Sequence, residues 1–173
     1  VLKEVASDMG KEDTFRPTPV GVYFGDGPGQ KSKDPFFGGE GPDRMGCNYC
    51  GGCMVGCRFH SKNTLDQNYL FLAEKLGAHV IPETKAVDLL PLNSTGQPDP
   101  TADGSYGYEI RTKSTTGFLG IPRKRFRARN VILSAGVMGT VGLLLEMKRK
   151  GRLTSLSPRL GSRVRTNSET VLV

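Results

Sequence analysis

Ten residues, Val131-Ile132-Leu133-Ser134-Ala135-Gly136-Val137-Met138-Gly139-Thr140, give the strongest indication of how this chain folds. The three aliphatic residues at the start of this run are typical of a fully buried strand in a parallel sheet. The small residues Ser134, Ala135 and Gly136 follow, and a helical pattern then extends from Met138 to Lys150. The run therefore predicts a strand, a tight turn and a helix, which is the repeating unit of an α/β fold.

The turn formed by Ser134, Ala135 and Gly136 is a candidate ligand site. In a strand-turn-helix unit, the unpaired N–H groups at the start of the helix lie at the carboxyl end of the sheet, where phosphates and flavins bind. Small residues also occur at such turns for packing alone. From these residues by themselves, ligand binding and simple packing both stay open.

An antiparallel meander is expected upstream of this unit. Short segments of alternating apolar residues predict strands at residues 79–81, 85–92, 106–110 and 123–129. Clusters of Gly, Pro, Asn and Asp separate the segments, as in hairpin loops. The fold class is therefore α/β, with the helices and antiparallel strands of this chain giving it an α+β character.

Further elements are predicted nearer the start of the chain. The segment 64–76 has apolar residues at three- and four-residue steps, a capping box at Thr64 and Gln67, and a glycine stop at Gly77. We expect this helix to bury one apolar face. Another helix is expected at residues 2–6, and a strand at residues 14–24.

Four cysteines, Cys47, Cys50, Cys53 and Cys57, lie in one glycine-rich loop, and the chain has no others. The spacing C-x2-C-x2-C-x3-C is that of a loop that wraps an iron–sulfur cluster, although the proline that normally follows is missing. Zinc would use the same thiolates, but structural zinc sites generally draw pairs of ligands from separate parts of a chain. Free or oxidised thiols are the third interpretation. The spacing leaves all three open.

Composition limits the classes of function. The net charge is +7 over 173 residues, but the basic residues of segment 123–129 alternate as on a solvated strand, so we expect no nucleic-acid partner. No apolar stretch approaches the roughly 20 residues that cross a bilayer, which predicts no transmembrane segment. The clustered cysteines indicate a reducing, cytoplasmic compartment. Because the chain opens on Val1, we expect it to be a piece of a larger protein.

The order of these elements resembles the glucose-methanol-choline (GMC) family of flavin oxidoreductases, and most of all its cholesterol oxidase branch. The resemblance rests on Lys62-Asn63-Thr64-Leu65-Asp66-Gln67-Asn68-Tyr69-Leu70, Gly77-Ala78-His79-Val80, Lys85-Ala86-Val87 and the run 131–140. It implies part of an FAD-binding, doubly wound domain with an inserted meander, beside part of a substrate-domain sheet. The implied division is residues 1–45 for the substrate domain, 46–62 for the Cys/Gly-rich loop and 63–173 for the FAD-binding domain.

The resemblance also implies a function and a set of site residues. The parent protein is expected to oxidise an alcohol, of sterol-like type, by hydride transfer to FAD, and the rest of the parent chain would be this chain's partner. Val87 matches the position whose backbone contacts the adenine. Ser134, Ala135 and Gly136 match the turn that passes close to the dinucleotide.

Two departures from the family pattern complete the set of expectations. The G-x-G-x-x-G fingerprint and the late catalytic histidine are missing, and His60 and His79 match neither role. No catalytic residue is therefore assigned, and the chain by itself is expected to be inactive. Some sugar dehydrogenases of the family carry an iron–sulfur cluster in a comparable segment, so an electron-transfer module built on Cys47 to Cys57 is the alternative function.

Overall fold

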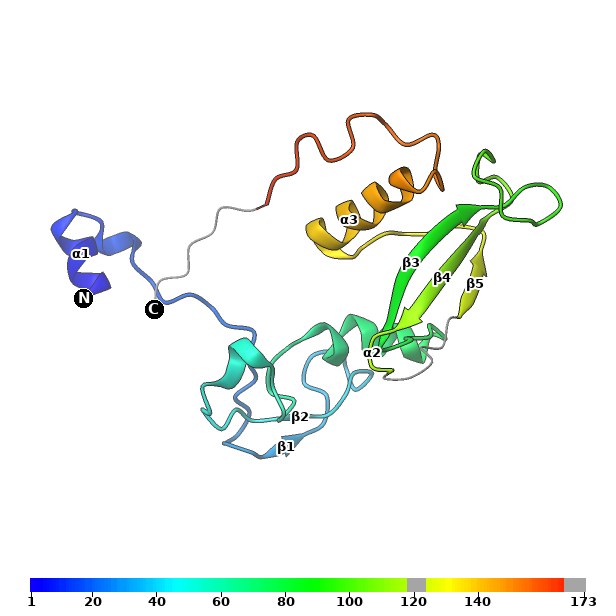
Figure 1. The fold of residues 1–173 in the computed structure, drawn as a ribbon. Coiled ribbons are helices and arrows are strands. Elements are labelled where there is room, and N and C mark those ends of the chain that lie inside the picture. The colour runs from blue at the N-terminus through cyan, green and yellow to red at the C-terminus, as the bar shows by residue number, and fades with distance from the viewer. Residues whose placement is uncertain (118–123, 167–173) are drawn as a thin grey trace. The chain divides into compact units, whose positions relative to one another are not determined.

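The computed structural model describes residues 1–117 and 124–166, and Figure 1 shows the path of the chain. The chain forms two compact units, Val1–Val80 and Ile81–Val173. The division at residues 45 and 62 that the resemblance implies stays a prediction.

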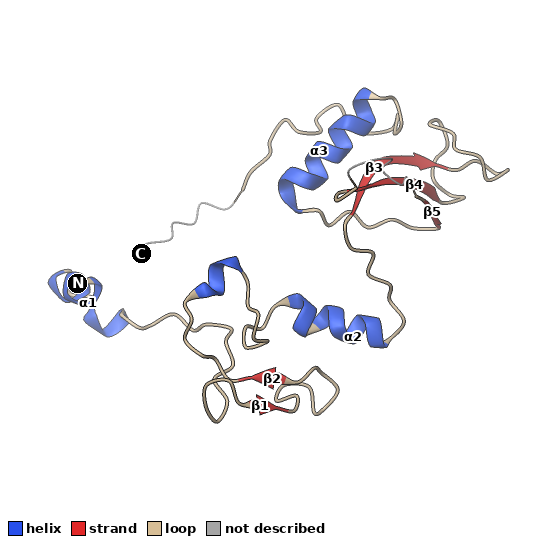
Figure 2. Cartoon of the chain, turned by 60° about the horizontal axis from the view of Figure 1, so that its bottom comes forward, coloured by secondary structure: helices blue, strands red, loops and turns tan. Residues whose placement is uncertain are grey.

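The second unit is built on a three-stranded antiparallel sheet in the order β3-β4-β5 (Figure 2). Its strands are β3 (Thr84–Pro91), β4 (Tyr108–Ser114) and β5 (Arg125–Ala128). The predicted meander is thus confirmed for these three strands, although Arg123 at the start of the last one lies outside the described residues. The strand expected at residues 79–81 is wrong, because this segment links the two units and pairs with no described strand.

Helix α3 (Gly136–Arg149) packs against β3, as Figure 1 shows, and confirms the predicted helix. Met147 of α3 is fully buried, and its Sδ atom accepts a hydrogen bond from the Leu89 N–H at 3.2 Å. The buried apolar side chains of the described residues are Leu89, Leu90, Leu92 and Met147. The small core of this unit therefore lies where β3 meets α3.

The buried parallel strand expected at Val131 to Leu133 is not formed. These residues pair with no described strand, and Ile132 is 89% exposed. A parallel strand is buried only when neighbouring strands and covering helices surround it, and the described strands of this unit are all antiparallel. The structure therefore supports a mixture of helices and antiparallel sheet, whereas the doubly wound sheet stays a prediction.

The first unit consists of short elements joined by loops. They are α1 (Leu2–Asp8), η1 (Glu12–Thr14), β1 (Lys31–Ser32), β2 (Arg44–Met45), η2 (Gly52–Val55), η3 (Leu65–Gln67) and α2 (Tyr69–Lys75). The helix expected at residues 2–6 is confirmed by α1. The strand expected at residues 14–24 is reduced to one isolated bridge between Val22 and Lys62. Pro17 and Pro19 explain this difference, because proline has no N–H to donate to a ladder.

The helix predicted at residues 64–76 is shorter than expected. Helix α2 begins only at Tyr69, where the side chain of Asn68, not that of Thr64, accepts the hydrogen bond of the first turn. Gly77 ends the helix in a left-handed conformation with φ 93°, as predicted. The expected buried face is not formed, since none of the residues of α2 is buried and Tyr69 is 72% exposed.

Arg44 organises the polar interior of the first unit. Its guanidinium is fully buried, lies 5.2 Å from the centroid of the Phe36 ring, and donates to the Lys62 and Gln67 carbonyls at 3.3 and 2.6 Å. A third hydrogen bond reaches Asn63 Oδ1 at 2.7 Å. This one side chain therefore connects β2 to the segment that leads into α2.

Candidate functional site

A groove of about 930 Å³ runs between the β3–β4 hairpin and one side of α3. A cavity of this size is at the upper end of the range seen for small-molecule and cofactor sites. The residues that line it are Thr84, Lys85, Ala86, Val87, Asp88, Arg111, Thr112, Lys113, Ala135, Met138, Gly139, Gly142, Leu143, Glu146, Lys150 and Arg152. Its wall combines small residues of α3, such as Gly139 and Gly142, with charged side chains of the sheet, such as Lys85 and Arg111.

Val87 lies in the wall of this groove, at an irregular point of the sheet. Ala86 pairs with Thr112 and Asp88 pairs with Arg111, so Val87 is the extra residue of a β-bulge. The extra residue of a bulge is left out of the strand ladder, and bulges are common next to active sites. Because β3 is also an edge strand of the described sheet, the backbone of Val87 is available for contact with a ligand.

Ala135 brings the predicted turn to the same groove. It precedes α3, and its N–H donates to the Thr140 hydroxyl at 3.1 Å, which holds the turn against the first part of the helix. The structure therefore places Val87 and Ala135 in one groove, although 47 residues separate them in the sequence. Neither the local periodicity of the sequence nor the spacing of its motifs indicates that Val87 and Ala135 lie in the same groove.

Ser134 and Gly136 flank the groove without lining it. Both are exposed, and Gly136 has a left-handed backbone with φ 68°. A Cβ atom added at Gly136 would meet no atom within 4 Å, so the space beside the turn is open. The need for glycine here is therefore conformational, since left-handed backbone is unfavourable for other residues.

The groove wall is positively charged. Its five basic residues, Lys85, Arg111, Lys113, Lys150 and Arg152, outnumber its two acidic residues, Asp88 and Glu146. Hydrogen bonds from Arg149 and then Lys150 lower the pKa of Glu146 from 4.5 to about 2, so this carboxylate stays ionised. An excess of positive charge in a concave wall favours an anionic ligand.

Sequence reasoning missed most of this wall. Arg111 and Lys113 alternate along β4, and Gly139 and Gly142 are three residues apart on α3. Residues three apart lie on one face of a helix, so the glycine pair leaves that face of α3 flat beside the groove. These two patterns could have indicated the wall, whereas nothing in the sequence indicates the bulge at Val87.

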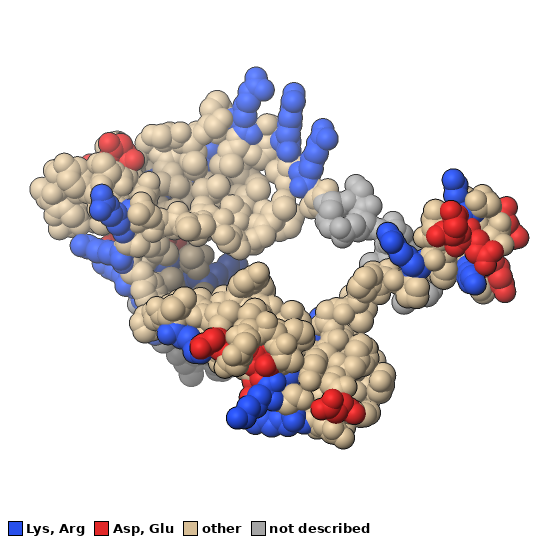
Figure 3. Space-filling model, turned by 180° about the vertical axis from the view of Figure 1, so that it is seen from behind, with Lys and Arg blue, Asp and Glu red and all other residues tan. Residues whose placement is uncertain are grey.

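Basic side chains elsewhere are distributed over the surface. Figure 3 shows Lys and Arg in separate groups on the face it presents, with acidic groups between some of them, among the residues drawn in colour. This view does not change the interpretation of segment 123–129 as a solvated strand, and the expectation of no nucleic-acid partner stays a prediction.

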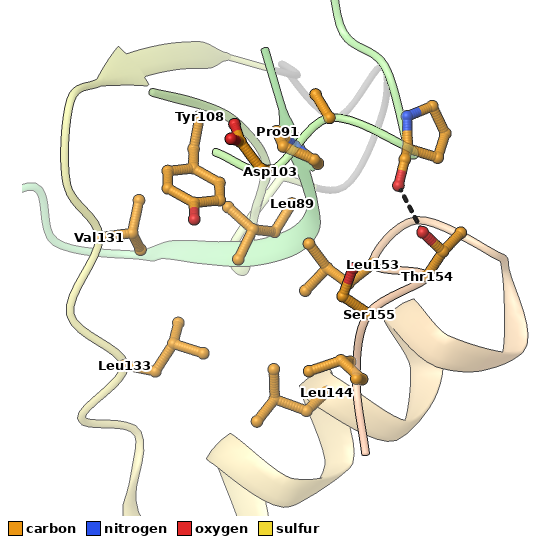
Figure 4. A pocket seen from close by; sticks show the side chains of 13 residues that line it. Leu89, Pro91, Asp103, Tyr108, Val131, Leu133, Leu144, Leu153, Thr154 and Ser155 are labelled. Carbon is orange, nitrogen blue, oxygen red and sulfur yellow. Dashed lines mark hydrogen bonds between the residues drawn. The ribbon is translucent and has the colours of Figure 1, made fainter. Parts of the chain in front are cut away.

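A second cavity of about 280 Å³ lies in the same unit and is mainly apolar (Figure 4). Leu89, Leu133 and Leu144 contribute to its wall, and the Thr154 hydroxyl donates to the Pro100 carbonyl at 3.0 Å beside it. None of the predicted site residues lines this cavity. Its wall combines aliphatic side chains with a few polar ones, among them Asp103, Tyr108 and Thr154.

The four cysteines all line one very small pocket of the first unit, together with Lys62. Lys62 Nζ donates to the Cys53 carbonyl at 2.7 Å, and the thiols form no disulfide. Burial acts to raise the pKa of Cys57, but the N–H groups of Lys62, Phe59 and Ser61 lower it below its usual value. Within residues 1–117 and 124–166, however, no group of three or more His, Cys, Asp or Glu side chains is arranged to hold a metal ion. The iron–sulfur alternative is therefore not favoured, and zinc gains no support.

The two histidines lie outside the groove. His60 and His79 are both exposed and belong to the first unit. That neither has a catalytic role stays a prediction. No helix within the described part of the chain is both long and apolar enough to span a membrane.

Comparison with known proteins assigns the family. The family model for GMC oxidoreductases matches residues 41–147, which includes Val87, Ala135 and the bulged hairpin. The chain belongs to the GMC oxidoreductase family. A protein named cholesterol oxidase from Acinetobacter baumannii is 47% identical over 175 residues, which cover 99% of this chain and 30% of that protein.

A second relative of this GMC oxidoreductase is equally similar. A protein named cholesterol oxidase from Mycobacterium tuberculosis (strain ATCC 25618 / H37Rv) is 48% identical over 176 residues, which cover 99% of this chain and 28% of that protein. The chain thus spans about 30% of the length of the curated relatives it matches. No solved structure matches the chain.

Membership of the GMC family implies FAD as the cofactor, and the groove fits this group. An open glycine turn, a bulge on an edge strand and an excess of basic side chains suit a flat adenine and a negatively charged pyrophosphate. Val87 and Ala135 would contact the dinucleotide from opposite walls, with Gly136 keeping the turn open. That these particular residues hold FAD stays a prediction.

Proposed function

We propose that the full-length protein oxidises an alcohol of the sterol class, and that this chain supplies part of its FAD site. The meeting of the Val87 bulge and Ala135 in one positively charged groove is the observation that supports the cofactor site. The names of the relatives support the substrate class. FAD would supply the hydride acceptor, and the residues of this chain would bind and orient it.

The same proposal assigns the parts of the chain to different domains of the full-length protein. We propose that residues 1–45 belong to the substrate domain, 46–62 form the Cys/Gly-rich loop, and 63–173 belong to the FAD-binding domain. The 173 residues contain no G-x-G-x-x-G fingerprint for the pyrophosphate. We therefore propose that this chain alone has no catalytic activity and that the remaining FAD contacts come from the rest of the parent chain.

The full-length protein, purified without added cofactor, tests the proposal. The yellow absorption of oxidised flavin is expected at one FAD per polypeptide, and anaerobic addition of a sterol alcohol is expected to bleach it. A secondary aliphatic alcohol serves as the control, because it contains the reacting group without the sterol ring system. A colourless protein that gains no FAD on reconstitution would refute the cofactor site, whereas bleaching by the aliphatic alcohol alone would refute the substrate class.

A further inference from the structure

Asp88 is a buried charged residue in the wall of the groove. It directly follows Val87, the extra residue of the β-bulge, and only 8% of its surface is exposed. A carboxylate taken out of water is costly unless opposite charges compensate it. The partners of Asp88 therefore indicate what this side chain holds in place.

Two arginines from different elements face Asp88. Arg111 is its cross-strand neighbour in β4, with Nη1 3.6 Å from Asp88 Oδ2. Arg152 follows the end of α3, and its Nε is 3.3 Å from Asp88 Oδ1. All three residues line the groove. The pairs thus connect the bulge to β4 on one side and to the segment after α3 on the other.

The contact between Asp88 and Arg152 depends on charge. Asp88 Oδ1 and Arg152 Nε are buried atoms that form no hydrogen bond within the described residues, although they lie 3.3 Å apart. Buried polar atoms are normally hydrogen-bonded. A pair held by charge attraction in this way is sensitive to loss of the charge itself, even when the shape of the side chain is kept.

We propose that Asp88, Arg111 and Arg152 form a positioning cluster that fixes the Val87 bulge and thereby the adenine end of the FAD site. This inference rests on the proposed function. The cluster acts through the backbone of Val87, in addition to the positive charge that Arg111 and Arg152 give the groove wall. Loss of the Asp88 charge releases the bulge from both arginines, and a contact made by the backbone of one residue is lost when that backbone shifts by about 1 Å.

Glu109 provides a matched control for this cluster. Its carboxylate is also buried, with 1% of the residue exposed, and it pairs with the same Arg111 at 2.9 Å and with Arg127 at 3.2 Å. Unlike Asp88, it does not line the groove and is not adjacent to the bulge. Asp88→Asn and Glu109→Gln therefore each remove one buried negative charge beside Arg111 and keep the side-chain shape.

The test measures cofactor affinity and thermal stability of the deflavinated full-length protein. The dissociation constant of FAD is measured by flavin fluorescence, that of ADP by competition, and the melting temperature by calorimetry. Both variants are expected to melt at a lower temperature. Only Asp88→Asn is expected to weaken FAD and ADP binding, by about tenfold, while Glu109→Gln binds both as the parent does. Equal weakening by the two variants would show a general loss of stability and overturn the proposal.

A second pair of variants keeps the test decisive if Asp88→Asn does not fold. Arg152 has a side chain that is 34% exposed, so Arg152→Ala is tolerated more easily than a change at a buried site. Arg152→Ala is expected to weaken ADP and FAD binding, and Arg152→Lys to restore most of it by restoring the charge. Unchanged ADP binding in Arg152→Ala would contradict the proposed positioning role of the cluster. A parent protein that binds no FAD at all would instead refute the proposed function, on which the cluster depends.

Discussion

At the scale of single residues, Val87 and Gly136 owe their interest to unusual backbone geometry of two different kinds. Val87 is the unpaired residue of a bulge, and Gly136 occupies a left-handed position with open space beside it. In the proposed FAD site, both positions would meet the ligand through the backbone rather than the side chain. The small-residue turn was predictable from its own sequence, whereas the bulge was not, because a bulge depends on how two strands pair.

Substitution of Val87 distinguishes a backbone contact from a side-chain contact. Val87→Pro removes the N–H and is expected to weaken FAD binding to the full-length protein about tenfold, since one hydrogen bond contributes on the order of 1 kcal/mol and the ring also alters the bulge. Val87→Ala keeps the N–H and is expected to bind FAD almost as the parent does. Fluorescence titration with FAD measures both, and an alanine variant that binds as weakly as the proline variant would contradict the backbone role.

Substitution of Gly136 tests the open turn. Gly136→Leu is expected to abolish FAD loading of the full-length protein and to reduce the free energy of unfolding by about 1–2 kcal/mol, because a side chain disfavours left-handed backbone. Gly96 is a suitable control, since it also has positive φ, 74°, and open space around an added Cβ. Gly96→Leu should cause similar destabilisation with full FAD content. One FAD per polypeptide in Gly136→Leu would exclude Gly136 from the cofactor site.

At the scale of secondary structure, local pattern predicted some elements well and others poorly. Helix α3 and strands β3 to β5 follow from periodicity and from the turn residues between them. The segment Val131 to Leu133 has the composition of a buried strand but no partner among the described strands. An apolar composition indicates that a segment can be buried, but the burial itself depends on neighbouring strands. The sequence of this segment alone could not show where those neighbours lie.

Helix α3 allows a quantitative check through Glu146. Hydrogen bonds from Arg149 and then Lys150 lower its pKa from 4.5 to about 2. Because the folded pKa lies below the ordinary value, these contacts stabilise the helix fully above pH 4.5, and the stabilisation is lost as the pH falls towards 2. Titration of the Glu146 carboxyl by NMR should find this low pKa, and Arg149→Ala should raise it.

Lys148 provides the control for the Glu146 titration. Its Nζ donates to the Ser157 carbonyl at 3.0 Å and makes no ion pair with Glu146. Lys148→Ala therefore removes one positive charge from the same helix and should leave the pKa of Glu146 low. An unmodified protein in which Glu146 titrates near its ordinary value of 4.5 would show that the Arg149 and Lys150 contacts do not persist in solution.

At the scale of the whole molecule, the family could be recognised from the sequence, but the arrangement of the groove could not. The runs at residues 62–70, 85–87 and 131–140 carry the resemblance, and the comparison with known proteins bears it out. The Asp88, Arg111 and Arg152 contacts bring together three separate segments. Such contacts depend on tertiary packing, and no local pattern encodes them. Likewise, the cysteine spacing left an iron–sulfur cluster, zinc and free or oxidised thiols open, and only the described geometry, in which no group of such side chains is arranged to hold a metal ion, makes the cluster the less favoured interpretation.

A crystal structure of the full-length protein with bound FAD tests the central claim most directly. We expect the adenine to lie against the backbone of Val87 and the dinucleotide to pass Ala135 and Gly136 along the groove beside α3. The bulge at Val87 should be present, with Asp88 between Arg111 and Arg152. FAD bound elsewhere, with this groove filled by side chains from the rest of the protein, would contradict the account.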